Sequence, residues 1–286
     1  MCRGCGRQTG FDEAVEGYAF RSGNLLMNTV PIHTISSGKR GRRGPAFARS
    51  FRRGPAGLNG SQLKLLAVLF MTVDHVGLTL VEQGILGGTA GSASAWWYVD
   101  LILRGIGRLA FPIFAFLLAE GAFHTRHEKE YGFRLLVFAL ISEIPFDLAL
   151  FGSWFYLGYQ NVLFTLLISY LSIMGIRRNL RHPALQILSA AAGCAAAALL
   201  KTDYGAMGVL MTVLLYWFRG SALRTAAGVA AAVIDSISWA GISALAFVPI
   251  HFYNGERGRF PGKYFFYIYY PAHLLAFYVL LRLLFG

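Results

Sequence analysis

Hydrophobic stretches alternate with short polar breaks from residue 59 to the end of the chain. They predict helices over 62–82, 96–120, 131–150, 160–176, 184–200, 205–219, 222–235, 237–253 and 264–285. Several approach the ~20 residues that a helix needs to cross a bilayer. The segments within 205–235 are short enough for one of them to be re-entrant or merged with its neighbour. We therefore expect an all-α polytopic membrane bundle of about nine transmembrane helices, within a range of eight to ten.

Composition supports the same fold class. Of the 286 residues, 56% are hydrophobic and only 14% are charged, whereas a soluble domain carries about 25% charged residues. This excludes an ordinary soluble protein and predicts a multi-pass protein of the cell (plasma or inner) membrane, with the lipid bilayer as its first partner. Residues 58–286 are expected to form the transmembrane domain.

Residues 1–57 differ from the rest of the chain. They are rich in Gly, Arg, Ser and Pro, show no periodicity, and hold ten Lys or Arg against three acids, which is +7 of the net charge of +12. This composition predicts a disordered basic cytoplasmic tail, and Met27 offers an alternative start within it. Attraction to anionic lipids explains the charge. Nucleic acid is not an expected partner, because base-stacking aromatics do not interleave the basic run.

Loop charges predict the topology. The breaks at 121–133, 177–183, 219–224 and 254–263 carry the basic residues, while the intervening breaks carry only Lys201. The positive-inside rule therefore places the N-terminus in the cytoplasm and, with nine spans, the C-terminus outside. The N-terminus lacks the pattern of a cleaved signal peptide, so the first hydrophobic segment is expected to remain as an anchor.

The three cysteines provide little chemistry. Cys2 and Cys5 form a lone C-x-x-C with no second pair, which supports a zinc site only weakly. Cys194, in Ala-Ala-Gly-Cys-Ala-Ala, is interpreted as a small packing residue. No metal is expected.

Asp74 and His75 are adjacent in the middle of the apolar run from Leu63 to Leu78. Ionisable groups inside a span cost several kcal/mol unless they face a polar interior, so they indicate function. A structural explanation is harder for two such neighbours than for one.

The second predicted span carries three charges on one face. Asp100, Arg104 and Arg108 lie at i, i+4 and i+8, and the first two have the spacing of an intrahelical ion pair. Arg108 lies deeper and needs an anion, either a carboxylate from another helix or a phosphate, because a guanidinium stays charged.

That span ends at Glu120 and His124, which lie at i, i+4 on the cytoplasmic side. One interpretation is a solvated helix end. The other is an anion site at the membrane face, where Arg126 and Arg134 hold a phosphorylated cofactor.

The third span carries Glu143, Pro145 and Asp147. The two acids repel at i, i+4, and the proline weakens the helix between them. Each acid therefore needs a partner such as His75 or Arg108, which gives Glu143 a functional or network role.

Three later polar residues are further candidates. Asp203 precedes a helix on the outer side, and Asn254 begins an Asn-Gly turn on the inner side. His273, two residues after Pro271, lies in mid-membrane. It is either a second site histidine or a satisfied interhelical hydrogen-bond partner.

Taken together and in order, these segments resemble the TraX family, polytopic membrane proteins named for the enzyme that N-acetylates conjugative pilin. The resemblance extends from Leu58 to Leu284. It rests on Leu63–Ala67 and Met71–His75, Gly107–Phe116, Glu120-Gly121 with His124–Arg126, Arg134-Leu135 with Ser142–Asp147, Asp203–Gly205, Tyr253–Gly255, Lys263–Tyr267 and Tyr270–His273.

The family is similar to a wider group of transmembrane acyltransferases. The resemblance implies acyl transfer from cytoplasmic acetyl-CoA to an acceptor at the outer face, with the first-span histidine, His75, as a catalytic group. The acceptor is an amine or hydroxyl, either a peptide or pilin N-terminus or an envelope glycan.

Acyl transfer needs a base, donors for the oxyanion and a site for the CoA phosphates. His75 is the expected base or transient acyl carrier, with Glu143 or Asp74 fixing its tautomer. Helix neighbours point about 100° apart, so we expect Asp74 to pair with Arg108 and Glu143 to orient His75. Candidates for the CoA phosphates are Arg126, Arg134 and Lys263.

Two other functional classes fit the same intramembrane charges. A proton-coupled transporter or a flippase of an envelope precursor requires Asp, His, Glu and Arg in its path, although no inverted repeat is visible in the sequence. A membrane scaffold would leave these charges as internal ion pairs. Binding of acetyl-CoA discriminates between these classes and the enzyme.

Overall fold

Every regular element that the computed structural model describes is a helix. The described residues are 57–87, 95–259 and 264–285. The prediction of a disordered tail over 1–57 therefore lies outside the described residues, apart from Gly57.

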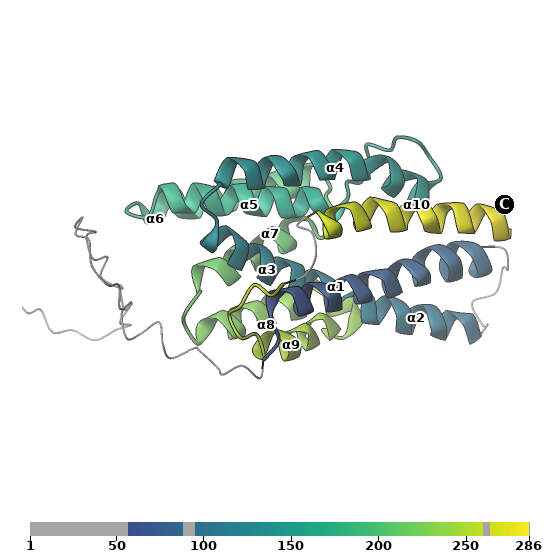
Figure 1. The fold of residues 1–286 in the computed structure, drawn as a ribbon, viewed down its shortest axis with the longest axis horizontal. Coiled ribbons are helices and arrows are strands. Elements are labelled where there is room, and N and C mark those ends of the chain that lie inside the picture. The colour runs from purple at the N-terminus through teal and green to yellow at the C-terminus, as the bar shows by residue number, and fades with distance from the viewer. Residues whose placement is uncertain (1–56, 88–94, 260–263, 286) are drawn as a thin grey trace, which may run out of the picture. The chain divides into compact units, whose positions relative to one another are not determined.

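The helices follow the predicted segments closely (Figure 1). In chain order they are α1 (Gly60–His75), the π-helix η2 (Val76–Leu86), α2 (Ala95–Gly107), α3 (Ala110–His124), α4 (Glu128–Phe151), α5 (Val162–Arg178), α6 (Pro183–Leu199), α7 (Gly205–Trp217), α8 (Leu223–Asp235), the 3-10 turns η3 (Ile237–Trp239) and η4 (Ile242–Ala246), α9 (Phe247–His251) and α10 (Phe265–Phe285).

Two details differ from the prediction. The segment 96–120 is divided between α2 and α3 at Arg108 and Leu109, and 237–253 is built from short 3-10 and α-helical turns. The short segments within 205–235 form two separate helices, α7 and α8, as their predicted bounds indicate. Helix α4 continues through Pro145.

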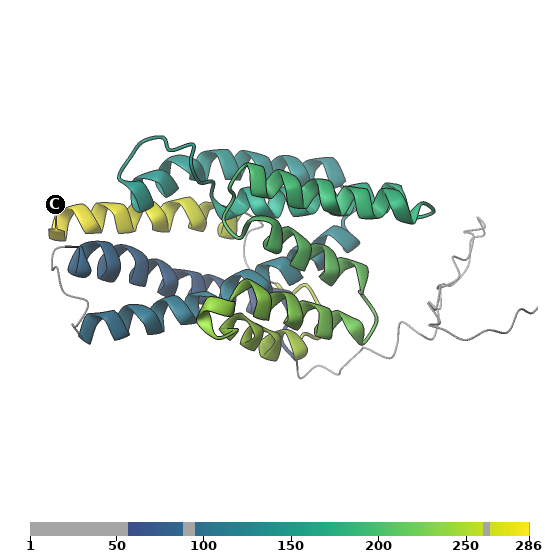
Figure 2. The same ribbon diagram turned by 180° about the vertical axis from the view of Figure 1, so that it is seen from behind.

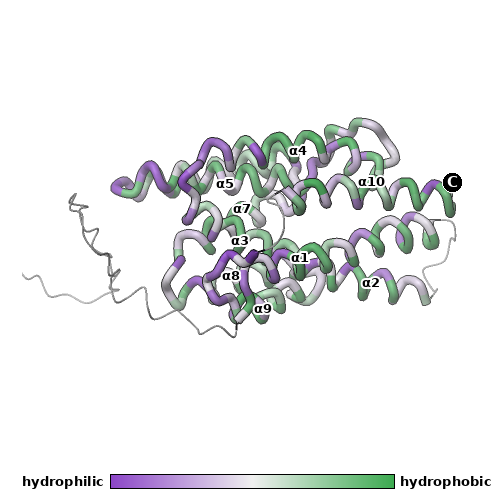
Figure 3. Tube along the Cα trace, in the orientation of Figure 1, coloured by the Kyte–Doolittle hydropathy of each residue, from purple (hydrophilic) through white to green (hydrophobic). Residues whose placement is uncertain are grey.

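Three of the helical segments are long and apolar enough to cross a membrane. They are Gly60–Leu86, Ala95–His124 and Phe265–Phe285. Hydrophobic residues cover most of α1, α3, α4 and α10, whereas hydrophilic residues gather at the tip between α5 and α6 (Figure 3). The structure thus supports a membrane protein with a helical fold.

Local sequence determines where the first helix begins and where it changes form. Asn59 and Gln62 form a reciprocal capping box that satisfies the first free N–H groups of α1. The α-helix ends at His75 and the wider π-helix η2 follows directly. Insertions of π geometry are frequent at functional sites, and here the change comes at the predicted catalytic histidine.

Helix α10 lies between α4 and α1 in both views of the ribbon (Figures 1 and 2). It contacts α4, α1 and η2, although some two hundred residues separate it from α1 in the chain. The apolar core lies mainly among α3, α5 and α7, where Phe111, Tyr170 and Met211 are fully buried. This arrangement brings the first and last described helices together.

Glycines allow α1 and α2 to approach each other closely, as small residues often do between membrane helices. A Cβ atom added at Gly107 would overlap the side chain of Asp74, whereas one added at Gly105 would make only an ordinary 3.5 Å contact with Ile242.

We therefore expect Gly107→Ala to lower the free energy of unfolding by about 1–3 kcal/mol, as overpacking does. Thermal unfolding of the detergent-solubilised protein measures the effect. Gly105→Ala, on the same helix, is the matched control. Equal midpoints of thermal unfolding for the two variants would show that Gly107 and Asp74 do not pack closely.

Candidate functional site

Two histidines meet between α1 and α10. His75 is the last residue of α1, and His273 lies in α10. His75 Nδ1 is 2.7 Å from His273 Nε2, and both side chains are buried, at 8% and 7% exposure. The structure thus brings together the predicted catalytic residue and the histidine that the sequence left open as a second site residue.

The hydrogen bonds determine which nitrogen of each neutral ring carries the proton. His273 Nδ1 lies 2.9 Å from the carbonyl oxygen of Tyr269. A carbonyl oxygen only accepts, so His273 Nδ1 is the donor and its Nε2 is an acceptor. His75 Nδ1 must then donate to His273, which leaves the lone pair of His75 on Nε2. This is the form that a general base requires.

Tyr269 holds the second histidine in place. Its ring stacks on that of His273 with centroids 5.0 Å apart, and its hydroxyl lies 2.8 Å from the Thr72 hydroxyl. Thr72 gives its own proton to the Val68 carbonyl, so Tyr269 donates to Thr72. The histidine pair is therefore fixed from both α1 and α10.

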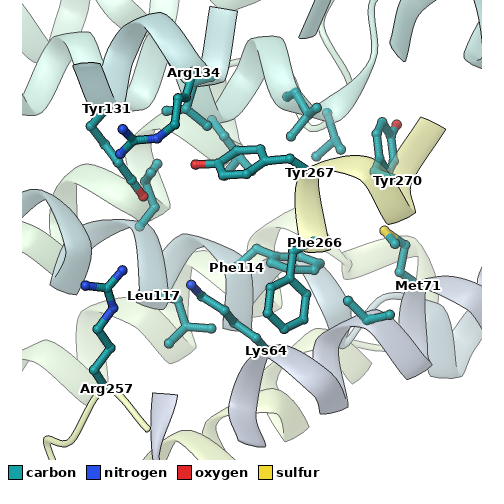
Figure 4. Close-up of a pocket in the computed structure, with 16 residues that line it drawn as sticks. Lys64, Met71, Phe114, Leu117, Tyr131, Arg134, Arg257, Phe266, Tyr267 and Tyr270 are labelled. Atoms are coloured by element: carbon teal, nitrogen blue, oxygen red, sulfur yellow. The ribbon is translucent and has the colours of Figure 1, made fainter. Parts of the chain in front are cut away.

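A cavity of about 160 Å³ is lined by residues of α1, α3, α4, α5 and α10, together with Arg257 (Figure 4). Its lining includes three cationic side chains, Lys64, Arg134 and Arg257, and none of the described residues that line it is acidic. Figure 4 shows these cations and the hydroxyls of Tyr131 and Tyr267 converging on one space. Such a group of donors suits the phosphates of a polyanionic ligand.

The opposite end of the cavity lies toward the histidines, although neither histidine lines it. Met71 and Tyr270 line it there, away from Arg257 and Tyr131. Met71 lies one helical turn before His75, and the ring centroids of Tyr270 and His75 are 6.4 Å apart. Lys64 lies eleven residues before His75, a rise of about 16 Å along α1. The cavity thus suits a ligand whose anionic part lies at the cationic end, away from the histidines.

Asp74 pairs with Arg104 rather than with Arg108, so the predicted partner was wrong. Arg104 Nη1 donates to Asp74 Oδ2 over 2.7 Å. Gly107 packs against Asp74, and the Arg104 side chain reaches the same carboxylate from three residues earlier on α2. The expected pair between Asp100 and Arg104 is also not formed, and Asp100 Oδ1 is buried without a partner among the described residues.

Arg108 lies at the break between α2 and α3. Its Nε is buried and has no hydrogen-bond partner among the described residues, and its guanidinium lies 5.4 Å from the ring centroid of Trp239. The carboxylates of Asp74, Asp203 and Asp235 attract it electrostatically without an ion-pair contact.

Glu143 does not orient His75, which corrects the second predicted partnership. The Asn161 side chain, which also caps the first turn of α5, donates to Glu143 Oε2. Asp147 accepts from the backbone N–H of Tyr156 over 2.7 Å. Both acids therefore hold the connection between α4 and α5, and the orienting role at His75 falls to His273.

Glu120 and His124 do not form an anion site with Arg126 and Arg134. Glu120 is buried and accepts instead from Arg219 and Arg224, the latter over 2.6 Å. His124 lies 3.4 Å from the same carboxylate. Glu120 is thus already neutralised from within the chain.

The residues that the sequence predicted to bind phosphate do not lie together in the structure. Arg134 lines the cavity, Arg126 is exposed on the connection between α3 and α4, and Lys263 lies outside the described residues. Lys64 and Arg257 complete the cationic group and were missed. The spacing from Lys64 to His75 could have identified the first, because eleven residues return to the same helix face.

Asp203 and Asn254 have partners away from the histidines. The Tyr159 hydroxyl donates to Asp203 Oδ1 over 3.0 Å. Burial raises the pKa of this carboxyl, while the hydrogen bond from Tyr159 opposes the shift. Asn254 joins the turn before α10 to the start of α1, donating its backbone N–H to the Leu58 carbonyl over 2.9 Å. Its role is that of a turn former.

Comparison with known proteins extends these observations. The model of the family described as "TraX protein" matches residues 59–281. A curated relative, "Probable fimbrial assembly protein FimC, serogroup H1" of Dichelobacter nodosus, is 33% identical over 238 residues, covering 74% of this chain and 91% of the relative. No solved structure matches significantly.

Proposed function

Because the chain belongs to the TraX family, we propose that it is a multi-pass acetyltransferase of the cell membrane, with its N-terminus in the cytoplasm and about nine spans. It takes acetyl from cytoplasmic acetyl-CoA and passes it to an amine or hydroxyl acceptor at the outer face. The observation that supports this most is the hydrogen-bonded histidine pair, which lies close to a cavity lined by three cationic side chains.

The cavity fits the acyl donor by charge. Lys64, Arg134 and Arg257 would bind the phosphates, and the end lined by Met71 and Tyr270 would take the pantetheine arm. The thioester would then lie on the side of the cavity that faces His75.

The transfer step follows from the tautomer of the pair. His75 Nε2 takes a proton from the acceptor nitrogen or oxygen as that atom attacks the thioester carbon. The carbon–sulfur bond then breaks, and the proton passes from His75 to the departing CoA thiolate. The imidazolium formed at His75 keeps its Nδ1–H bond to His273, so the ring holds its orientation through the step.

The acceptor class follows from the relative, whose name assigns it to fimbrial assembly. We propose a pilin-like peptide N-terminus as the acceptor, with an envelope glycan hydroxyl as the alternative to be distinguished.

Purified protein tests the proposal. We expect acetyl-CoA at micromolar concentration to raise the unfolding temperature of the detergent-solubilised protein, and labelled acetyl to pass from acetyl-CoA to an acceptor. If acetyl-CoA neither raises the unfolding temperature nor donates its acetyl group, the result favours the transporter. Flux measurements in proteoliposomes would then test that function.

The cationic group gives a sharper prediction. We expect Lys64→Gln or Arg134→Gln to weaken acetyl-CoA binding at least about 10-fold, because a charge-assisted hydrogen bond contributes about 1.5–3 kcal/mol. Isothermal titration with acetyl-CoA measures this.

Arg126→Gln is the matched control, since Arg126 is exposed and does not line the cavity. Equal dissociation constants for the Lys64, Arg134 and Arg126 variants would show that the phosphates bind elsewhere.

A further inference from the structure

A cluster of charged side chains joins the last turn of α3 to the turn between α7 and α8, and its charges do not balance. Glu120 of α3 is buried. Arg219, in the turn after α7, donates to it from Nε and Nη2 over 3.1 Å each, and Arg224, in the first turn of α8, donates from Nη1 over 2.6 Å. Two guanidiniums, which stay charged, thus share one carboxylate, so the cluster keeps a positive charge.

Neighbouring side chains do not remove this charge. His124 Nε2 lies 3.1 Å from Arg219 Nη2. Because a guanidinium only donates, His124 Nε2 accepts this bond and brings no negative charge. Glu128, the next acid along the chain, pairs with Arg177 over 3.3 Å. Among the described residues, Glu120 is therefore the one acid that forms an ion pair with the two arginines of the cluster.

Arg224 carries an unused pair of hydrogen-bond donors. Its Nε and Nη2 atoms are buried and have no hydrogen-bond partner among the described residues. These two N–H groups lie on one edge of the guanidinium, the same edge that Arg219 turns toward Glu120. Such an edge matches two oxygens of a carboxylate or a phosphate. An unpaired buried donor is costly, and an oxyanion beside Arg224 would satisfy both donors.

The surface around the cluster is apolar as well as cationic. Phe123, Trp217 and Leu223 are exposed there, at the ends of α3, α7 and α8 that meet at the cluster. The Arg219 guanidinium lies 3.6 Å from the ring centroid of Phe123. A soluble anion would leave these apolar side chains uncovered, whereas the acyl chains of a lipid would cover them. The surface therefore favours an anion that carries acyl chains.

We propose that this cluster binds the phosphate of an anionic phospholipid. Arg224 and the exposed part of Arg219 would hold the phosphate oxygens, and the acyl chains would lie along Phe123 and Leu223. The turn between α7 and α8 lies at the same end of the bundle as the tip between α5 and α6 (Figure 1), and the loop charges place both at the cytoplasmic surface. Basic groups between membrane helices at that surface bind lipid headgroups. The site is separate from acetyl transfer and does not depend on it.

Thermal unfolding of the full-length protein in mixed micelles tests the site. The probes are dioleoylphosphatidylglycerol, the zwitterionic dioleoylphosphatidylcholine, and glycerol phosphate, which carries a phosphate without acyl chains. A ligand that binds the folded state raises the unfolding temperature, and we expect this rise with phosphatidylglycerol alone. No rise with phosphatidylglycerol would overturn the site. An equal rise with phosphatidylcholine would overturn the recognition of charge, and an equal rise with glycerol phosphate would overturn the lipid as the source of the phosphate.

A matched pair of variants locates the binding. Leu223→Glu places a carboxylate next to Arg224, where it competes with the phosphate. Leu180→Glu makes the same change in charge on an exposed leucine of the tip between α5 and α6 and is the control. We expect Leu223→Glu to weaken the apparent affinity for phosphatidylglycerol at least about tenfold, as measured from the unfolding temperature at increasing lipid content, and Leu180→Glu to keep the wild-type affinity. Equal affinities in the two variants would overturn the site.

Arg219→Gln replaces Leu223→Glu if that variant fails to fold, because Arg224 still pairs with Glu120. Its control is Arg181→Gln, which removes the same charge from an exposed side chain of the tip. We expect Arg219→Gln to weaken the affinity for phosphatidylglycerol at least about tenfold, and Arg181→Gln to leave it unchanged. Wild-type affinity in Arg219→Gln would place the lipid elsewhere on the protein.

Discussion

Replacing His75 by alanine is expected to lower kcat for acetyl transfer by about 10²–10⁴-fold, the range that a positioned general base contributes. The affinity for acetyl-CoA should change little, because His75 does not line the cationic cavity and Lys64 lies about 16 Å away from it along α1. Single-turnover transfer from labelled acetyl-CoA separates these two quantities. Acetyl transfer by His75→Ala at the wild-type rate would show that His75 takes no part in the reaction.

A matched control and a graded variant accompany this experiment. His251 is an exposed histidine of α9, outside the histidine pair, and His251→Ala should leave kcat unchanged. His273→Ala should lower kcat less than His75→Ala and alter its pH profile, because His273 acts only by orienting the ring of His75. Identical losses in the His75 and His273 variants would instead indicate that both rings take part directly.

The sequence was sufficient to predict most of the helices and to single out His75 as a candidate site residue. Long apolar runs with polar breaks define the elements, and a histidine in such a run is too costly to be incidental. The division of the segment 96–120 was not predicted, although Gly107 directly precedes the break at Arg108 and Leu109, because the apolar pattern continues on both sides of it.

Partners were harder to predict than sites. His75 and His273 are 198 residues apart, and no local pattern encodes the rotation of α10 that brings them together. Arg104 and Arg108 have the sequence spacing of one helix face, but α2 ends at Gly107, so Arg108 lies at the break and Arg104 pairs with Asp74. Glu143 was assigned to His75 because nothing in the sequence singled out its actual partner, Asn161, which lies 18 residues farther along the chain.

The pair formed by Asp74 and Arg104 supports a second strong prediction. Their side chains are 22% and 17% exposed and lie in segments long enough to cross a membrane. Glu82, the other acid near Arg104, is 3.8 Å away and half exposed. Arg104→Met would therefore leave the Asp74 carboxylate without its principal counter-ion, and removing one partner of a buried pair costs about 3–5 kcal/mol.

We expect Arg104→Met to lower the free energy of unfolding by about 3 kcal/mol, the lower end of that range, because both groups retain some exposure. The double variant Asp74→Leu with Arg104→Met replaces the pair by apolar groups and should regain most of this loss, since such replacements are often neutral. Chemical unfolding of the detergent-solubilised protein measures both. A double variant as unstable as the single one would mean that Arg104 stabilises the bundle by packing and not by charge. Recovery in the double variant would show that the carboxylate beside His75 serves the fold, and acetyl transfer by that variant would then test directly whether Asp74 also has a part in the chemistry.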